Sequence, residues 1–370
     1  MLSTGSVIDE TLSEYRGRMP ILESLTVYIF GTQSKKCHTT FEIAPHLTEL
    51  NLELSKGTYI RFPWAQLTKL RLTLSHISGG FATGNELHAF LLPLQNVEDL
   101  QFTIPYFDIA LANLKCPPVR LTRLQSLKLS VGVASVAFSW LETPFLERLL
   151  LDSQYLGISD AVACRKEITS LIGRSSCRIR QLTLESCFGE IARCLTYTLV
   201  GVEELYIMDF GQIPRIVRYI ADRTYLPKMR VFQVDCCPGC FRGLVADLSR
   251  LSKARSKEST ESSTCDIAPL ERLKIRVGWD CEEPCCTAFN CGSRTQIVSA
   301  LQAISSWPSF SVTDVHSDQS NKWSITLNAR ALAAGTLIDL TFYRPHSDLD
   351  IYVDEYCSCQ SVLENMCVAI

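Results

Sequence analysis

The sequence predicts an α/β fold in which short parallel strands alternate with helices along one array. Three observations predict it: a spaced leucine pattern that recurs, proline just upstream of several copies, and helical periodicity between copies. The stretch FPWAQLTKLRLTL shows the pattern, with Leu67, Leu70, Leu72 and Leu74 at offsets of three, two and two. A helix repeats its apolar face every three or four residues and a strand every two. The spacing therefore indicates a chain that bends into a short strand.

Recurrence of this spacing identifies a repeat. About ten copies occur, roughly 20 to 40 residues apart, against 20 to 29 in regular leucine-rich repeats with the signature L-x-x-L-x-L. The copies are Leu22/Leu25/Val27, Leu47/Leu50/Leu52, Leu67/Leu70/Leu72, Val97/Leu100/Phe102, Leu124/Leu127/Leu129, Leu146/Leu149/Leu151, Ile179/Leu182/Leu184, Val202/Leu205/Ile207, Met229/Phe232/Val234 and Leu270/Leu273/Ile275. The pattern predicts an irregular leucine-rich-repeat (ribonuclease-inhibitor-like) solenoid, with strands on the concave face and helices and loops on the convex face.

Proline and helical segments support the period. Pro45, Pro144, Pro227 and Pro269 precede copies of the pattern, where we expect them to stop the preceding element and force an extended approach to the strand. Segments of about three turns that are apolar on one side predict outer helices. They begin at Thr83, Cys164, Ile213, Cys240 and Ser293.

The domain organisation follows from where the pattern begins and fades. We expect a lead-in at 1–18, a repeat array at 19–292 with a mobile Ser-rich, charged loop at 252–264, and a C-terminal helix and cap at 293–370. Two alternating runs between Trp323 and Pro345 predict a pair of closing strands. The first repeat lacks the polar cap of a solenoid end, which favours a truncated chain over the alternative of a free-standing repeat protein.

Composition narrows the function classes. A formal net charge of −3 gives no electrostatic reason to expect nucleic acid or an anionic membrane as the main partner. The sequence shows no signal peptide, no apolar run of about 18 residues and no N-x-S/T site, which predicts an intracellular protein, cytoplasmic or nuclear. No catalytic motif is found and the six histidines are dispersed, so we expect no enzyme and no cofactor.

Cysteine clusters leave one metal hypothesis open. Cys237 and Cys240 have C-x-x-C spacing, and Cys281 and Cys285 follow about one repeat later, so the four thiolates could bind zinc. The second cluster lacks a C-x-x-C pair, and Cys236 and Cys237 fall at the end of a repeat strand, where small apolar residues pack. Incidental reduced thiols are therefore the favoured interpretation, and zinc is the alternative.

Five segments resemble a known family: FEIAPHLTELNLEL, FPWAQLTKLRL, LTRLQSLKLSV, TPFLERLLL and LIGRSSCRIRQLTL. They look like the repeat region of the expanded F-box proteins of mushroom-forming (basidiomycete) fungi, and the resemblance covers residues 19–277. It implies repeats that select substrates for a cullin-RING ubiquitin ligase through a Skp-type adaptor. The chain has no F-box segment L-P-x-E-(I/L)-L, so that adaptor is implied only if the full gene product supplies one.

A second departure from regular repeats is the missing Asn ladder. The ninth position of the pattern holds other residues throughout: Ser55, Ser75, Pro105, Gly132, Gln154, Cys187, Phe210, Cys237 and Gly278. Asn there would bond neighbouring turns, so its absence predicts an irregular horseshoe with weaker coupling between repeats.

The expected binding surface consists of the strand residues between the leucine-type positions. If the leucines point inward, the third, fifth and seventh positions of each copy face the concave side. Leu150, Tyr206 and Met208 are the candidates for a partner-binding centre, unless the register slips there and they are core. Arg272, Lys274 and Arg276 could bind an acidic or phosphorylated ligand. The complete candidate set for an unknown protein ligand is Arg71, Lys128, Arg148, Leu150, Tyr206, Met208, Arg272, Lys274 and Arg276.

Overall fold

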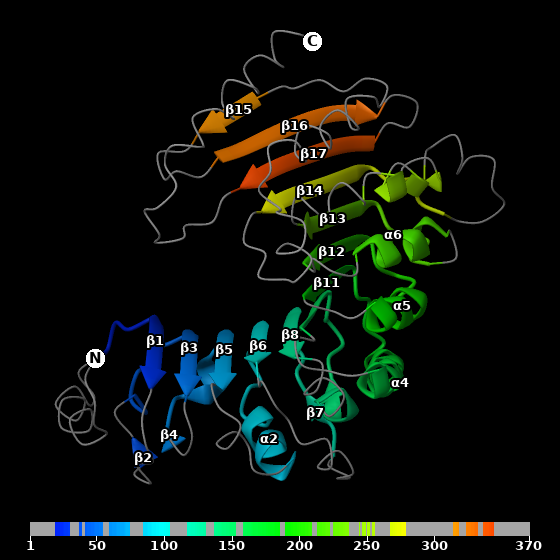
Figure 1. Cartoon of the computed structure of the whole chain (residues 1–370). Coiled ribbons are helices and arrows are strands. Elements are labelled where there is room, and N and C mark those ends of the chain that lie inside the picture. The colour runs from blue at the N-terminus through cyan, green and yellow to red at the C-terminus, as the bar shows by residue number, and fades with distance from the viewer. Residues whose placement is uncertain are drawn as a thin grey trace. The chain divides into compact units, whose positions relative to one another are not determined.

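The computed structural model describes residues 19–29, 37–38, 41–54, 59–74, 84–103, 117–130, 137–152, 158–185, 189–208, 213–222, 225–236, 244, 246–248, 250–251, 254–255, 267–278, 314–317, 323–331 and 336–343. The chain divides into two compact units, Met1–Glu185 and Ser186–Ile370. Figure 1 shows parallel strands and helices in each unit. The fold is therefore mixed α/β, as the sequence predicts.

The first unit is built on seven described parallel strands in a single spatial sequence. Their order follows the chain: β1 (Ser24–Ile29), β3 (Glu49–Leu54), β5 (Lys69–Leu74), β6 (Asp99–Thr103), β8 (Ser126–Ser130), β10 (Arg148–Asp152) and β11 (Gln181–Glu185). Two shorter parallel pairs lie apart from this sheet, β2 (Cys37–His38) with β4 (Tyr59–Ile60) and β7 (Val119–Arg120) with β9 (Leu141–Glu142). Neighbours in sequence are thus neighbours in space, as in a stacked array.

Helices of the first unit cover the leucine side of the sheet. They are the short η1 (Trp64–Gln66), α2 (Gly84–Leu91) and α4 (Ile158–Ser175). Leu87 and Leu91 of α2 and Ile168 and Leu171 of α4 are buried. α2 and α4 therefore each turn one apolar stripe inward, as an outer helix on a sheet must.

The second unit combines parallel strands with an antiparallel end. Its order is β12 (Glu204–Met208), β13 (Val231–Cys236), β14 (Arg272–Gly278), β17 (Thr336–Tyr343), β16 (Trp323–Ala331) and β15 (Asp314–Ser317). β12, β13, β14 and β17 are parallel to one another. β16 pairs antiparallel with β17, and β15 pairs antiparallel with β16. The two runs between Trp323 and Pro345 pair with each other, as expected, and the pairing is antiparallel. Two helices, α5 (Gly189–Thr198) and α6 (Ile213–Ala221), lie beside β12 and β13 in Figure 1.

Three of the five expected helices are confirmed as α2, α4 and α6, although α4 begins earlier than expected, at Ile158. Residues 244, 246–248, 250–251 and 254, from the segment that starts at Cys240, are helical. The segment from Ser293 and most of the expected loop at 252–264 lie outside the described residues. α5 was not expected, because it starts at Gly189 and contains two β-branched Thr residues, which weakens its helical signal.

From Leu47 onward the leucine-type positions form the core, which confirms the predicted strand register; those of the first copy, Leu22, Leu25 and Val27, are half-buried. Leu127, Leu205 and Ile207 are 0% exposed, and the residues that alternate with such positions within each strand are half-buried or exposed. The alternation of buried and outward residues holds in β6, β8, β10 and β12. Neighbouring strands align these positions with one another, so Leu100, Leu127 and Leu149 form one buried row.

The prolines lie within turns instead of forcing an extended approach. In Ala44–Leu47, Thr143–Leu146 and Leu226–Met229, the N–H of the fourth residue donates to the carbonyl of the first, at 3.0–3.2 Å. Pro45, Pro144 and Pro227 each hold the second position, where proline's fixed φ suits a β-turn. Pro269 differs, since the Leu270 N–H donates to the Arg255 carbonyl. For Pro45, Pro144 and Pro227 the expectation was correct about position and wrong about conformation, whereas no turn is assigned around Pro269 in the described residues.

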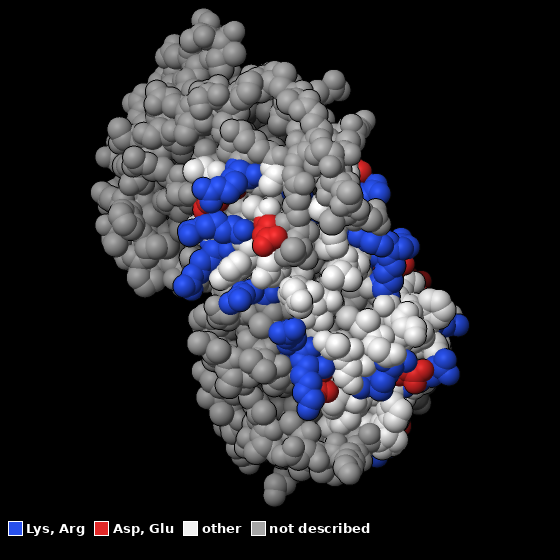
Figure 2. Space-filling model, turned by 90° about the vertical axis from the view of Figure 1, so that its right-hand side faces the viewer, with Lys and Arg blue, Asp and Glu red and all other residues white. Residues whose placement is uncertain are grey.

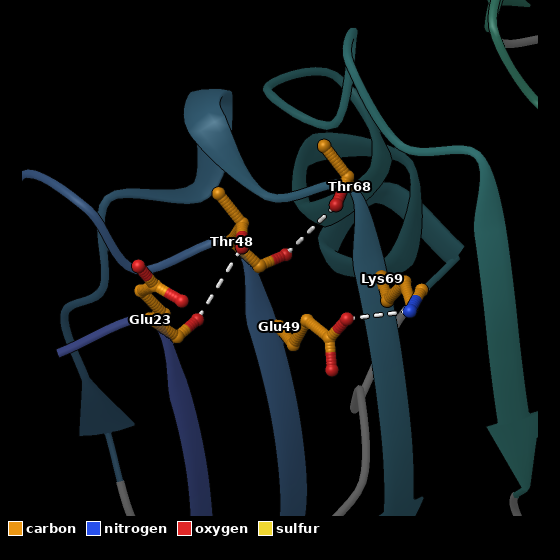
Figure 3. A network of polar contacts seen from close by, with 5 residues as sticks. All are labelled: Glu23, Thr48, Glu49, Thr68 and Lys69. Carbon is orange, nitrogen blue, oxygen red and sulfur yellow. Dashed lines mark hydrogen bonds and ion pairs between the residues drawn. The ribbon is translucent and has the colours of Figure 1, made fainter.

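Backbone hydrogen bonds couple successive strands at the residue just before each strand. The carbonyl of that residue accepts two N–H groups from the start of the next strand, at 2.7–3.1 Å. The accepting residues are Glu23, Thr48, Thr68, Glu98, Gln125 and Glu147 in the first unit and Glu203 and Arg230 in the second. In Figure 3 the Thr48 hydroxyl adds a third bond to Glu23, and Thr68 a third bond to Thr48. These are main-chain bonds of the parallel ladder at the strand starts. Of the ninth positions only Gly278 is described, so the predicted weaker coupling there lies outside the described residues.

Candidate binding surface

The outward residues of the strands form the surface that the sequence singled out. We call it the open face, meaning the third, fifth and seventh positions of each strand pattern. Register places these positions in rows, because each pairs with its equivalent on the next strand. One such row in the first unit runs Thr26, Asn51, Arg71, Gln101, Lys128, Leu150 and Thr183. The open face is therefore a lattice of side chains at strand spacing, about 4.8 Å across the strands.

Near β3, β5 and β6 the open face is polar and internally paired. Lys69 Nζ lies 2.5 Å from Glu49 Oε1 on the neighbouring strand (Figure 3), and this hydrogen bond raises the pKa of Lys69. Arg71, a candidate residue, is exposed and donates from Nε to Gln101 Oε1 at 2.8 Å. Both pairs join equivalent positions on adjacent strands, where cross-strand side chains meet. The polar groups here therefore have partners before any ligand arrives.

Between β8 and β11 an ion pair crosses over β10. Lys128 Nζ lies 2.5 Å from Glu185 Oε2, and the two side chains are 24% and 22% exposed. Leu150, on the intervening strand, is half-buried and pairs in register with Lys128 and Thr183. Thr183 is itself buried despite its outward position. Lys128 and Leu150 thus belong to one partly closed region, whereas Arg148 next to it is exposed.

Tyr206 dominates the start of the open face in the second unit. It is half-buried on β12, and its hydroxyl donates to Glu204 Oε2 at 2.7 Å. Burial, followed by the hydrogen bond and charge of Glu204, raises the pKa of Tyr206 to about 12, while the charge of Arg272 opposes the shift. Met208, two residues on, is also half-buried and outward. Both residues lie outside the core, so the alternative of a slipped register is wrong.

The basic strand β14 has acidic neighbours in register. Lys274 pairs with Gln233 on one side and Asp339 on the other, and Arg276 pairs with Asp235 and Thr341. Arg272 is exposed and Lys274 half-buried, while the side chain of Arg276 lies outside the described residues. Asp235 is buried, and Gln233 donates to it at 3.4 Å. The carboxylate of Asp235 on the adjacent strand reduces the local positive field, which weakens the case for a phosphate ligand on β14.

The candidate set is divided between the two units. Arg71, Lys128, Arg148 and Leu150 lie in the first, and Tyr206, Met208, Arg272, Lys274 and Arg276 in the second. Within the first unit the described contacts link Lys128 and Leu150 through register, and within the second Tyr206 interacts with Arg272 electrostatically. Of the expected centre, Leu150 therefore lies in the first unit and Tyr206 and Met208 in the second.

Sequence reasoning missed the acidic partners of these residues. Glu49 and Lys69 occupy the same third position in consecutive copies, so their pairing was readable from the pattern. Glu185 meets Lys128 diagonally, from the seventh to the fifth position two strands away, which the pattern does not indicate. Glu204 reaches Tyr206 along one strand.

The cysteine hypothesis is largely outside the described structure. Cys236 is buried at the end of β13, as expected for a packed thiol, but Cys237, Cys240, Cys281 and Cys285 are not described. Among the residues that the structure describes, no three His, Cys, Asp or Glu side chains are grouped to hold a metal ion. Cys164 and Cys177 are buried, and burial raises the pKa of the Cys177 thiol.

Comparison with known proteins gave no relative. No protein-family model matches the chain, and no curated protein matches it either. Of the helices in the described part, none is long and apolar enough to cross a membrane. The family resemblance therefore depends on the sequence segments quoted above.

Proposed function

We propose that this chain is a non-catalytic leucine-rich-repeat protein whose open face binds another protein. The observation that carries the proposal is the strand lattice, in which rows of outward side chains lie above a continuous row of buried leucine-type residues. Such a surface offers many positions of independent chemistry on a rigid support. That is the property a protein-recognition surface requires.

The F-box resemblance suggests the setting in which the repeats would act. A Skp-type adaptor would engage an F-box supplied by the full gene product, and the open face would then select a ubiquitin-ligase substrate. The alternative within the same class is a free-standing scaffold that binds without recruiting a ligase. Only the ligase role requires binding to the adaptor; in both roles the open face binds the protein partner.

Tyr206 and Met208 are the sharpest test of the open face. Both are half-buried groups outside the core, and aromatic and Met side chains are enriched at interface centres. Both variants should remain folded: Met208→Ala should cost within about 0.5 kcal/mol, and Tyr206→Ala about 1 kcal/mol more because it also loses the hydrogen bond to Glu204. Each should weaken partner binding by about 1 to 2 kcal/mol, which corresponds to roughly five- to thirtyfold.

The measurement is quantitative partner capture from a fungal lysate, with the captured protein then titrated in purified form. Tyr197→Ala is a matched control, because Tyr197 is an exposed aromatic on α5 of the same unit, away from the strands. Equal binding by wild type, Tyr206→Ala and Met208→Ala would show that the open face of the second unit is not the interface. A loss restricted to the strand variants supports the proposal.

A further inference from the structure

An exposed phenylalanine lies among arginines at the edge where β8, β10 and β11 begin. The group consists of Arg123, Phe145, Arg148, Arg178 and Arg180, and we call it the Arg-Phe edge. Phe145 is 62% exposed, and all four arginines are exposed as well. A single exposed apolar side chain is ordinary on a monomer surface, whereas an exposed apolar group within a wider patch often marks a binding site. The neighbours of Phe145 therefore decide what it means.

Backbone geometry brings the five residues together. Arg123 and Phe145 each hold the third position of a β-turn, closed by Leu124 N–H to Leu121 and by Leu146 N–H to Thr143. The next residues are bonded strand to strand, since Gln125 accepts from the backbone of Glu147 and Arg148, and Glu147 from that of Arg180 and Gln181.

Arg178 precedes Arg180 by the same two residues that separate Phe145 from Glu147. Adjacent strands lie about 4.8 Å apart, so the equivalent positions before the three strands, Arg123, Phe145 and Arg178, span roughly 10 Å. Phe145 lies on the middle strand, with an arginine at the equivalent position on each side.

Three cations of the Arg-Phe edge, Arg123, Arg148 and Arg180, differ from several other exposed cations of the first unit. Arg61, Lys69 and Arg120 each form an ion pair, with Glu42, Glu49 and Glu142 respectively. Within the described residues, the side chains of Arg123, Arg148 and Arg180 form no hydrogen bond or ion pair. Lys and Arg also predominate over Asp and Glu on the face shown in Figure 2.

Equivalent turn positions elsewhere in the first unit serve a different purpose. Gln66 and Asn96 occupy the same position before β5 and β6, and their side-chain amides bond to carbonyls of the preceding turn, at 2.6–2.9 Å. At the equivalent position, Arg123 and Phe145 carry a cation and an aromatic ring that face solvent, where Gln66 and Asn96 carry amides bonded to the backbone. The change leaves the backbone turns intact and creates a surface of different chemistry.

We propose that the Arg-Phe edge binds a short acidic segment of a protein partner, one that carries an apolar residue among its carboxylates. Arginine forms paired, charge-assisted hydrogen bonds with carboxylates, and Phe145 supplies the apolar contact between them. The inference rests on the proposed function, because it assumes a protein partner, and it adds a second contact region at the strand edge.

A nucleic acid fits this surface less well. Glu147 lies at the centre of the group, between Gln125 and Arg180 in the bonded row, and is exposed. A continuous phosphate backbone would be repelled there, whereas a peptide can place an apolar residue or an amide next to Glu147. The single aromatic ring also offers little for successive bases to stack on.

The test is a fluorescence anisotropy titration of the full chain with a labelled synthetic peptide of Asp and Glu around one central Phe. Arg180→Glu should weaken binding about tenfold, because it removes an attractive charge and adds a repulsive one. Phe145→Ser should weaken it about fivefold and abolish the preference for this peptide over one with Ser in place of the central Phe. Raising the salt concentration should weaken wild-type binding.

Two controls separate the possible outcomes. Lys166→Glu makes the same change in net charge at an exposed position on α4 and should alter binding by less than about twofold. Arg71→Glu changes the open face on β5 in the same way. If Arg71→Glu abolishes peptide binding while Arg180→Glu does not, the proposed function stands and the Arg-Phe edge is wrong. Absence of peptide binding at low salt, equal losses for Lys166→Glu and Arg180→Glu, or tighter binding of a poly-uridine oligonucleotide would each overturn the inference.

Discussion

Arg255 is the residue whose removal should reveal most about how the second unit is held together. Its side chain is completely buried, and its guanidinium donates to three main-chain carbonyls. Nη1 bonds to Leu226 at 2.9 Å, and Nη2 bonds to Ile220 at 3.0 Å and Tyr225 at 2.5 Å. Ile220 belongs to the last turn of α6, so the cation also lies at the negative end of the helix dipole.

The expected cost of Arg255→Met follows from these contacts. Hydrogen bonds to a charged group contribute about 1.5 to 3 kcal/mol each, so three give roughly 5 to 9 kcal/mol before relaxation. Met keeps most of the aliphatic volume, and water can reach some of the carbonyls after the segment at Tyr225 and Leu226 shifts. We therefore expect a loss of about 3 to 5 kcal/mol, the range for breaking a buried charged interaction. Arg255→Lys retains the charge and should recover part of that loss.

The assay is urea denaturation followed by circular dichroism, with hydrogen exchange to assign the loss to the second unit. Arg250→Met is the matched control, because Arg250 lies five residues away and is exposed, and its side chain forms a 3.5 Å ion pair with Asp247. That control should cost within about 0.5 kcal/mol. A loss below about 1 kcal/mol for Arg255→Met, with an unchanged denaturant slope, would refute the argument that this guanidinium joins α6 to the following turn.

Two further predictions test the core and the open face. Leu127→Asp places a charge in a completely buried row and should cost several kcal/mol in denaturation experiments, whereas Thr103→Asp, outward on β6, should cost about 1 kcal/mol or less; equal costs would invert the assignment of the two sheet faces. Tyr206 has a folded-state pKa of about 12 against an ordinary value of 10.0, so its contribution to stability is present below pH 10 and is lost as the pH rises toward 12. Stability of the Tyr206→Phe variant should therefore fall less than that of wild type over this interval, and ultraviolet titration should show one fewer late-ionising tyrosine.

The fold was predictable because one short pattern fixes both a strand and its buried face. Leu100, Leu127 and Leu149 are spaced as their sequence copies indicate, and each occupies the same place in its strand. The prolines showed where turns occur, but their conformation depends on the hydrogen bond that closes each turn. α5 was missed because Gly189 and its two Thr residues weaken the helical signal, and burial of Ala192 and Leu195 favours the helix.

The binding surface was predictable by position more than by chemistry. Alternation correctly placed Arg148, Leu150, Tyr206 and Met208 outside the core. The sequence pattern did not reveal that Lys128 pairs with Glu185 across a strand, because strands far apart in sequence decide which charges meet. The Arg-Phe edge was missed for a related reason: Arg123, Phe145 and Arg180 are scattered over 58 positions, 123 to 180, and only strand pairing collects them.

The main-chain coupling between strands explains how this array tolerates such varied side chains. Here the carbonyl before each strand accepts two backbone N–H groups from the next strand, whatever side chain is present: Glu23, Thr48, Gln125 and Glu147 all serve. Side chains at these positions and at the turns are consequently free to change without loss of the coupling. The side-chain amides of Gln66 and Asn96 donate to backbone carbonyls before β5 and β6, whereas Arg123 and Phe145 face solvent at the same position before β8 and β10. A repeat whose coupling lies in its backbone can therefore acquire new binding chemistry at its edge as well as on its open face.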